Sequence, residues 1–396
     1  MHRKWWLLVY PLVLLLYGIY SYSQVTPNLV LSSNPVFWQF QQTMWQLGYH
    51  QRPLSTYIYV GLILASFAAY ALVLKQIQKG RLTNKLFILQ FALCIIALLP
   101  SYPALSNDIF NYLMNAKMMH VYDASPYKHA AWDFPQEPWL SFMMNVHTTT
   151  PYGYVWTFLG YLTYMLALGD LQLGMLLFRL LAVASVIAIG WSIWQLSKKD
   201  KRMFLTGFFI FNPLIMLEAI NNTHNDITMM AFLIFGLALY HRFQKKSKAK
   251  ALAILCAGWI LSVYTKLVTV ILPSVGVFYY VIRKKIPWFN AADYGAWLLV
   301  VAMFADGSKR FFSWYLLWAF CLAPLARSKF TRNLLLLFTF TALMSYVFYL
   351  YNGEYTSAQG FARVSLLFSL PVAYIVFWIC TSIQSSKCIP KIGSAS

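Results

Sequence analysis

One aspartate follows an apolar run so closely that its position alone suggests chemistry. Asp108 stands in the stretch Ser106-Asn107-Asp108, a few residues after an apolar segment that ends near residue 100. A carboxylate this near the edge of a bilayer is costly unless it has a partner or a function. On a helix over 106–120, the residues that share its face are Asn111, Tyr112 and Asn115. We predict that Asp108 is a catalytic base beside a lipid-linked substrate; the structural alternative is that it caps this helix.

A single carboxylate suits the transfer of a sugar onto a hydroxyl group. The hydroxyl must lose its proton as the new bond forms, and a carboxylate is able to take that proton. One carboxylate is enough when the leaving group is a phosphate, because a phosphate departs without being protonated. Tyr127, in the downstream Ser125-Pro126-Tyr127, is a residue that we expect to orient the sugar.

A second polar group lies in a tight turn over 221–226, between two apolar stretches. Thr223 and Asp226 fit a capping box that opens the next helix, and this is the structural alternative. Capping does not explain His224 and Asn225, for which we predict hydrogen bonds to sugar hydroxyls or to phosphate. We place Asp226 in the same substrate-binding group. His224 with Asp226 is a poor metal-site signal, so we predict no metal ion.

Basic and aromatic residues beside apolar stretches are candidates for binding phosphate and sugar. A cation at the membrane surface is able to neutralise a lipid-linked phosphate and stabilise it as a leaving group; the alternative is simple snorkelling. The residues that we predict to bind phosphate are Lys266, Arg179, Arg310 and Arg363. Trp314 and Tyr315 are either ordinary interfacial aromatic residues or, as we predict, platforms that stack against sugar rings.

The chain as a whole is apolar enough to be a polytopic helical membrane protein. Of its 396 residues, 60% are apolar and 11% are charged, which excludes an ordinary soluble protein. A helix needs about 20 apolar residues to cross the hydrocarbon core. We predict an all-α fold with about twelve transmembrane helices, at 5–22, 54–74, 86–101, 173–197, 203–219, 227–243, 251–265, 267–282, 291–305, 311–326, 333–351 and 361–381.

The basic residues form short clusters between the apolar runs, although the net charge is +20. Such clusters mark cytoplasmic loops, so we expect membrane lipids and not nucleic acid as partners. This rule makes 102–172 a large extracytoplasmic loop with interfacial helices at 106–120 and 152–168. The alternative, in which 152–168 crosses the membrane, would place the later basic clusters outside.

We predict one integral-membrane domain over 1–396, because the sequence shows no repeat and no linker. It contains no Gly-rich phosphate loop, no His-Glu-x-x-His and no paired Cys-x-x-Cys. We therefore expect no nucleotide-binding domain that drives the activity, no cofactor and no metal.

Taken in order, the polar segments resemble the GT-C superfamily of integral-membrane glycosyltransferases, which use polyprenyl-phosphate sugars. The nearest resemblance is to the bacterial polyprenol-phosphomannose-dependent α-1,6-mannosyltransferases, and the catalytic subunit of the GPI mannosyltransferase is a more distant likeness. The resemblance covers roughly 85–330. The matching segments are Ser106-Asn107-Asp108 with Pro126-Tyr127, Thr150-Pro151-Tyr152-Gly153, Asn212-Pro213 with His224-Asn225-Asp226, Lys266, and Ser313-Trp314-Tyr315-Leu316-Leu317-Trp318.

The resemblance implies a GT-C-like fold, Asp108 as the base, and a polyprenyl-phosphate sugar, with mannose as the hexose, as the donor. It also implies that Asn107, Tyr112 and Tyr152 contact substrate. Many relatives carry two acids at this motif, whereas here Asn107 precedes a lone Asp108, so metal assistance is not implied. The short outer loops favour a glycolipid or an envelope glycan over a bulky protein as the acceptor.

We therefore predict an inverting hexosyltransferase in a bacterial plasma membrane, with its active site facing outside. The alternatives from other classes are a transporter or flippase of lipid-linked sugars and a scaffold protein. A different enzyme of lipid-linked sugars, such as a ligase, is a further alternative. Transporters typically show repeat symmetry and ionisable groups near the middle of the membrane, whereas the acids here gather on one predicted side.

Overall fold

The structure is a computed structural model that describes residues 4–282, 289–305, 312–354 and 357–387. Within these ranges the chain forms helices and connecting turns and no strand, which confirms the all-α prediction. The α-helices are α1 (Trp6–Ser21), α2 (Pro35–Trp45), α3 (Arg52–Gln78), α4 (Asn84–Leu98), α5 (Asp108–Val121), α6 (Tyr154–Leu166), α7 (Leu171–Leu196), α8 (Arg202–Ile210), α9 (Asp226–Phe243), α10 (Lys248–Thr265), α11 (Pro273–Ile282), α12 (Ala291–Ala305), α13 (Leu316–Phe320), α14 (Lys329–Met344), α15 (Val347–Asn352) and α16 (Ser357–Lys387). Shorter 3-10 and π turns are η1 (Tyr22–Gln24), η2 (Gln46–His50), η3 (Ala131–Asp133), η4 (Pro138–Ser141), η5 (Ile215–Asn221), η6 (Leu267–Ile271), η7 (Ser313–Tyr315) and η8 (Ala323–Leu325).

Seven helical stretches in the described ranges are long and apolar enough to cross a membrane. They are Trp6–Gln24, Arg52–Gln78, Leu171–Leu196, Asp226–Phe243, Lys248–Thr265, Lys329–Asn352 and Gln359–Ser382. Each of them coincides with one of the predicted spans. The protein is therefore an integral membrane protein of the polytopic helical class.

The remaining predicted spans are shorter or broken in the structure. The span at 203–219 is the pair α8 and η5, which meet at an angle of 60°. The shorter apolar helices are Asn84–Leu98, Leu267–Val281, Ala291–Phe304 and Ser313–Leu325. The last of these differs most from the sequence prediction, because the short helical segments η7, α13 and η8 follow one another in place of one long helix, and their apolar residues are buried inside the protein. Hydropathy alone does not distinguish such a buried segment from one that faces lipid.

Buried tyrosines bind the carbonyl groups that the break after α8 leaves free. Tyr10 of α1 donates to the carbonyl of Phe211 at 2.8 Å, and Tyr70 of α3 donates to that of Phe208 at 2.9 Å. A backbone carbonyl without a partner is costly in a membrane interior, so a broken helix requires such donors. These bonds fix the bent segment, and with it the start of the turn over 221–226, against α1 and α3.

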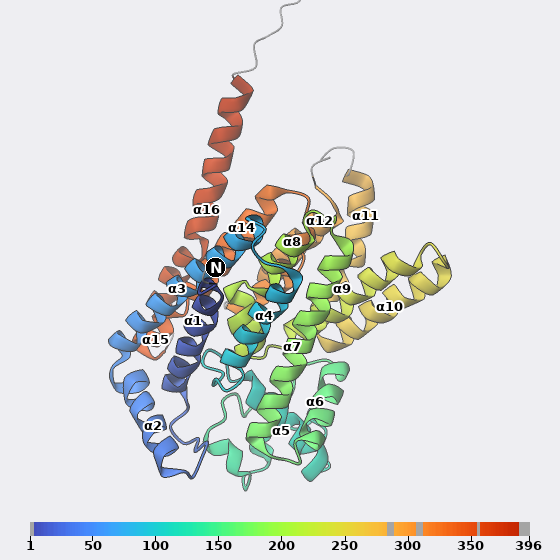
Figure 1. Cartoon of the computed structure of the whole chain (residues 1–396). Coiled ribbons are helices and arrows are strands. Elements are labelled where there is room, and N and C mark those ends of the chain that lie inside the picture. The colour runs from blue at the N-terminus through green and yellow to red at the C-terminus, as the bar shows by residue number, and fades with distance from the viewer. Residues whose placement is uncertain (1–3, 283–288, 306–311, 355–356, 388–396) are drawn as a thin grey trace, which may run out of the picture.

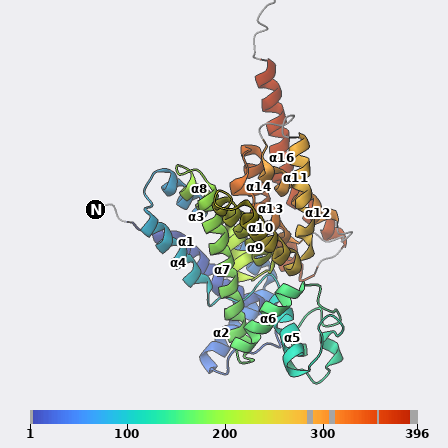
Figure 2. The same cartoon turned by 90° about the vertical axis from the view of Figure 1, so that its right-hand side faces the viewer.

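Helices α5 and α6 lie together at one end of the bundle, where α5 also packs against α7 (Figure 1). Turning the molecule by 90° leaves them at that same end (Figure 2). Helix α6 has 13 residues, about 20 Å at 1.5 Å per residue, which is too short to cross about 30 Å of hydrocarbon. These two helices occupy the stretches predicted to be interfacial; their position at the membrane surface stays a prediction.

Candidate active site

Asp108 is the first residue of α5, and its carboxylate is not used to cap the helix. The N-cap residue, Asn107, makes no capping hydrogen bond with its side chain. The hydroxyl of Ser106 accepts the backbone N–H of Asp108 at 3.2 Å. The Asp108 side chain stays 22% exposed and lines a cavity of about 830 Å³, a volume within the usual range for ligand sites.

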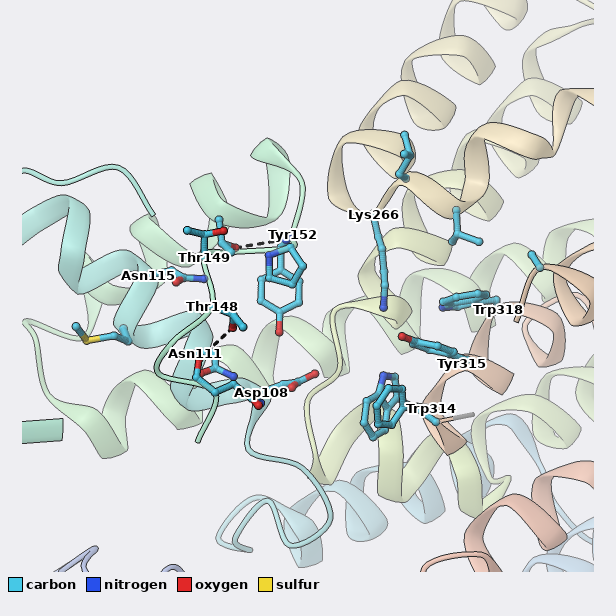
Figure 3. Close-up of a pocket in the computed structure, with 18 of the residues that line it drawn as sticks. Asp108, Asn111, Asn115, Thr148, Thr149, Tyr152, Lys266, Trp314, Tyr315 and Trp318 are labelled. Atoms are coloured by element: carbon cyan, nitrogen blue, oxygen red, sulfur yellow. Dashed lines mark hydrogen bonds between the residues drawn. The ribbon is translucent and has the colours of Figure 1, made fainter. Parts of the chain in front are cut away.

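One wall of this large cavity is polar and comes from the loop region around α5. The residues of this wall are Asp108, Asn111, Asn115, Asn145, Thr148, Thr149, Thr150 and Tyr152. Their amides, hydroxyls and single carboxylate are the groups with which proteins bind sugar hydroxyls. Figure 3 shows several of them pointing into the same space from α5 and from the loop before α6.

The opposite wall is apolar and aromatic, with one cation on it. The residues of this wall are Lys266, Leu267, Val268, Val270, Ile271, Ala302, Phe312, Trp314, Tyr315 and Trp318. In Figure 3 the Lys266 side chain extends toward the polar wall beside Trp318 and Tyr315. The cavity is therefore amphipathic, and its cation lies on the side opposite Asp108.

Lys266 forms an ion pair with the aspartate at the start of α9. Its ammonium nitrogen lies 2.7 Å from Oδ1 of Asp226, and the indole N–H of Trp318 also donates to Asp226. The ammonium lies 4.8 Å from the ring centre of Tyr315, at cation–π distance. The predicted capping box is not formed, because the Thr223 hydroxyl donates to the carbonyl of Ile220 instead.

His224 connects Asp108 to a second, fully buried carboxylate. Nδ1 of His224 lies 3.4 Å from Oδ2 of Asp108, and Nε2 lies 3.4 Å from Oε2 of Glu218. The ring of Trp314 stacks on the imidazole at 4.3 Å and 14°. Burial lowers the pKa of His224, but the two carboxylates outweigh it and raise this pKa to about 9. The two carboxylates thus favour the charged form of the imidazole.

The turn over 221–226 is tied to the segment that precedes Asp108. The amide of Asn221 donates to the hydroxyl of Ser101 at 2.5 Å and to the carbonyl of Tyr102 at 2.9 Å. The side-chain oxygen of Asn222 accepts the backbone N–H of Leu105 at 3.2 Å. These bonds hold two segments more than 100 residues apart in the sequence at a fixed distance. They set the position of Asp108 relative to His224.

A smaller cavity of about 220 Å³ meets the large one at Asp108. Its lining includes Gln24, Thr26, Tyr49, Asn107, Tyr349 and Arg363. Asp108 and Trp314 line both cavities. Asp108 thus lies between the two cavities, of which the large one bears Lys266 and the small one bears Arg363.

The structure brings most of the predicted site residues together and leaves some apart. Around the two cavities or directly behind them lie Asp108, Asn107, Tyr152, His224, Asp226, Trp314, Tyr315, Lys266 and Arg363. Tyr112 is buried behind the polar wall, where its hydroxyl accepts the backbone N–H of Asn225 at 3.4 Å. The Asn225 side chain is also buried. Arg310 lies outside the described residues.

Two predicted residues have partners away from the cavities. Tyr127 shares a hydrogen bond of 2.7 Å with the hydroxyl of Thr157. Arg179 is buried and donates to the carbonyls of Leu99, Ile220 and Asn221 at 2.5, 3.3 and 3.0 Å. These carbonyls give Arg179 a structural role at the base of the turn, and phosphate binding by this residue stays a prediction.

The structure also adds residues that we did not assign to the site from the sequence. Thr148 to Thr150 and Asn145 form much of the polar wall, and a run of small polar residues in a loop carries no specific signal. Glu218 lies inside an apolar stretch. The energetic cost of a carboxylate in a membrane is the sequence signal that indicates a function for it. In the described ranges, no group of three or more His, Cys, Asp or Glu residues is arranged to hold a metal ion.

The fold and the cavities define a polytopic helical membrane protein with an amphipathic site. Residues 13–281 match the family described as alpha-(1->6)-mannopyranosyltransferase, N-terminal domain. This match covers more than half of the chain, and the protein belongs to that family. It confirms the resemblance to α-1,6-mannosyltransferases that the sequence motifs indicate.

Two curated relatives from Corynebacterium glutamicum are similar over part of their length. Alpha-(1->6)-mannopyranosyltransferase A is 25% identical over 148 residues, which are 37% of this chain and 30% of the relative. Alpha-(1->6)-mannopyranosyltransferase B is 24% identical over 155 residues, which are 38% of this chain and 26% of the relative. The chain thus spans less than a third of each of these relatives in the matched region. No solved structure gives a significant match.

Proposed function

We propose that the protein is an inverting mannosyltransferase that moves mannose from a polyprenyl-phosphate donor to a glycolipid or envelope-glycan acceptor. One observation carries this proposal: the Asp108 carboxylate lies where two cavities meet. A transfer between two substrates requires that both reach the same base from different sides. Family membership supports the choice of mannose as the transferred sugar.

The large cavity is suited to the donor. Its polar wall offers hydrogen bonds to a sugar, and its apolar wall, which includes Leu267 and Ile271, offers contacts to an isoprenoid chain. Lys266 lies on the apolar wall, where a phosphate would connect these two parts of a lipid-linked sugar. An ammonium there would stabilise the charge that develops on the leaving phosphate.

The small cavity is suited to the acceptor. It reaches Asp108 from the side of Arg363 and Tyr49, and its lining includes further amide and hydroxyl groups. An acceptor hydroxyl entering from this side would meet the carboxylate before it meets the donor. Trp314, which lines both cavities, would then contact the sugars on either side of the reacting bond.

In the proposed step, the acceptor oxygen forms a bond to the anomeric carbon while the bond from that carbon to the phosphate oxygen breaks. The hydroxyl proton passes to a carboxylate oxygen of Asp108, and the bonding electrons leave with polyprenyl phosphate. Attack opposite the leaving group inverts the anomeric configuration through an oxocarbenium-like transition state. The basic clusters of the sequence support an orientation in which this occurs on the outer face.

Replacing the base tests this proposal. Purified protein in nanodiscs receives radiolabelled polyprenyl-phosphate mannose and a crude envelope-lipid acceptor. We expect transfer by the wild type and a loss of about 10²-fold or more in Asp108→Asn, the contribution typical of a general base. The matched control is Asp123→Asn, which changes an exposed aspartate with a positive φ of 47°, a conformation that asparagine tolerates.

The outcomes separate the base from the reaction class. Equal turnover in wild type and Asp108→Asn would remove Asp108 from the role of base. No transfer by a folded wild type would contradict the proposed activity and favour transport of lipid-linked sugars.

A further inference from the structure

We propose that Glu218 and His224 are positioning residues for Asp108: the buried imidazole, held between two carboxylates, fixes the carboxylate of the base. This inference rests on the proposed function, because it assigns a role to His224, which contacts Asp108, and to Glu218, which contacts His224, although neither residue lines a cavity. His224 and Glu218 are fully buried, whereas the Asp108 side chain is 22% exposed. In the row formed by Glu218, His224 and Asp108, only Asp108 is therefore accessible to substrate.

Both ring nitrogens of the imidazole face a carboxylate. Nε2 faces Glu218 and Nδ1 faces Asp108, each at 3.4 Å. The Trp314 ring, stacked at 4.3 Å, covers one face of the imidazole. Activated side chains in enzymes are commonly arranged in this way: one group orients a second, and the second orients the reacting group.

Glu218 is itself held in place from its own turn. The amide of Asn222 donates to Oε2 of Glu218 at 2.8 Å, and the same Asn222 binds the backbone of Leu105. The carboxylate of Glu218 and the segment before Asp108 therefore share one anchor. Thr223, the next residue, has a positive φ of 61°, which is uncommon for a residue other than glycine. Backbone strain of this kind persists only where surrounding contacts impose it.

Charge explains why a second carboxylate is present. A buried cation beside Asp108 would by itself neutralise the base that the reaction needs. With Glu218 on its far side, the imidazole lies between two carboxylates, so that a positive charge on it has a second partner besides Asp108. A fully buried ion pair is weak grounds for a stabilising role alone. A role in positioning accounts for the costly burial of both groups.

Several titratable groups face this row of residues from the elements packed around it. They are Tyr112 on α5 and Tyr152 before α6, which face Asp108, and Tyr17 on α1, which faces Glu218, while Asp108 and Glu218 themselves face the imidazole. Of these, Asp108 and Glu218 contact the imidazole directly. Any change in the pH dependence of a His224 variant is therefore compared with the pH dependence of variants of these two carboxylates.

The test compares Glu218→Gln, Glu218→Asp and His224→Gln with the wild type in the transfer assay. We expect Glu218→Gln and His224→Gln to lower kcat about tenfold or more, a part of what general-base catalysis contributes. We expect KM for the donor to change less than twofold, because neither residue touches the cavities. We expect Glu218→Asp, which keeps the charge, to recover part of kcat. In His224→Gln the acidic limb of the pH–rate profile should move to higher pH, because the neighbouring cation that favours an ionised carboxylate is gone.

The matched control is Asp293→Asn, which alters another fully buried aspartate whose partners are backbone N–H groups near Arg327 and Ser328. We expect it to lower the melting temperature and to leave kcat of the folded protein unchanged. If Glu218→Gln does not fold, the double variant Glu218→Gln/His224→Gln removes both charges together and is expected to show the same loss of kcat.

The outcomes keep this inference distinct from the proposed function. Transfer that is lost in Asp108→Asn but unchanged in Glu218→Gln and His224→Gln would overturn the inference and leave the proposed function intact. Equal falls in kcat and in folded fraction, with no shift of the pH profile, would show a structural role and overturn it as well. No transfer by the wild type would overturn both.

Discussion

At the scale of single residues, Lys266 of the large cavity pairs with a buried aspartate and still stays partly exposed. The Lys266 side chain is 21% exposed, whereas that of Asp226 is 1% exposed. A phosphate entering the cavity therefore reaches the lysine and not the aspartate. Asp226 and the rings of Tyr315 and Trp318 hold the ammonium in place before substrate arrives, which avoids the cost of ordering a flexible side chain during binding.

Removing this cation should slow the transfer itself. We expect Lys266→Met, which keeps the apolar stem, to lower kcat by about 10²-fold, because stabilisation of developing charge is worth this much in comparable sites. Lys266→Arg should retain more activity, since it keeps the charge. Steady-state kinetics with the polyprenyl-phosphate donor measures both effects.

Lys266→Met also leaves the buried Asp226 without its partner, which destabilises the fold. The double variant Lys266→Met/Asp226→Asn removes both charges and should recover the melting temperature without recovering kcat. Recovery of both would show that the pair is structural and that the phosphate is stabilised by another group.

At the scale of elements, one glycine allows the two walls of the large cavity to meet. The N–H of Gly153, just before α6, donates to the carbonyl of Thr265 at 3.1 Å. A Cβ at position 153 would lie 2.0 Å from the carbonyl oxygen of Tyr264. Tyr152 and Lys266, the neighbours of this contact, belong to opposite walls. The absence of a side chain at 153 therefore sets the width of the cavity.

We expect Gly153→Ala to lower kcat/KM by about 10²-fold, because displacing reacting groups by an ångström has effects of this size. The matched control is Gly61→Ala within α3, where an added Cβ has no atom within 4 Å. That change should be neutral or slightly stabilising, by about 0.5–1 kcal/mol, as alanine favours a helix over glycine. Donor kinetics and thermal unfolding of both variants give the comparison, and equal kcat/KM values would contradict this account of the cavity.

At the scale of the whole molecule, α5 and α6 lie together at one end of the bundle (Figures 1 and 2), and residues of α5 line both cavities. Several other polar connections are rich in lysine and arginine, as in the segment 242–250. The positive-inside rule then predicts that α5 and α6 lie outside the cell. A lipid-linked donor would enter the large cavity from that leaflet.

Cysteine labelling in intact cells tests this orientation. In a background in which Cys94, Cys256, Cys321, Cys380 and Cys388 are replaced by alanine, cysteine is introduced at the exposed positions Asp123 or Lys246. We expect a membrane-impermeant maleimide to label the Asp123→Cys variant in intact cells. The Lys246→Cys variant should react only after the cells are opened. The reverse pattern would place the site in the cytoplasm.

Much of the fold was predictable because the signals that specify it are local. Apolar length and basic clusters predicted stretches that coincide with the seven long helices and with the bent pair α8 and η5. The span at 311–326 was wrong as a continuous helix, because its apolar residues serve a buried core and not a lipid surface. Hydropathy measures the cost of exposing a side chain to water and carries no information on which apolar neighbour covers it.

The sequence by itself determined the membrane class, the family motifs and the costly polar residues, since residue type and spacing alone express these properties. Only the tertiary structure decided which of these residues meet. Asp108, Glu218 with His224, Lys266 and Trp314 come from separate elements, and long-range packing brings them together at one site. The tertiary structure also determines that Arg179 donates hydrogen bonds to three backbone carbonyls. A charged residue in an apolar stretch of the sequence indicates that it needs a partner. The identity of that partner depends on contacts between segments that are far apart in the sequence.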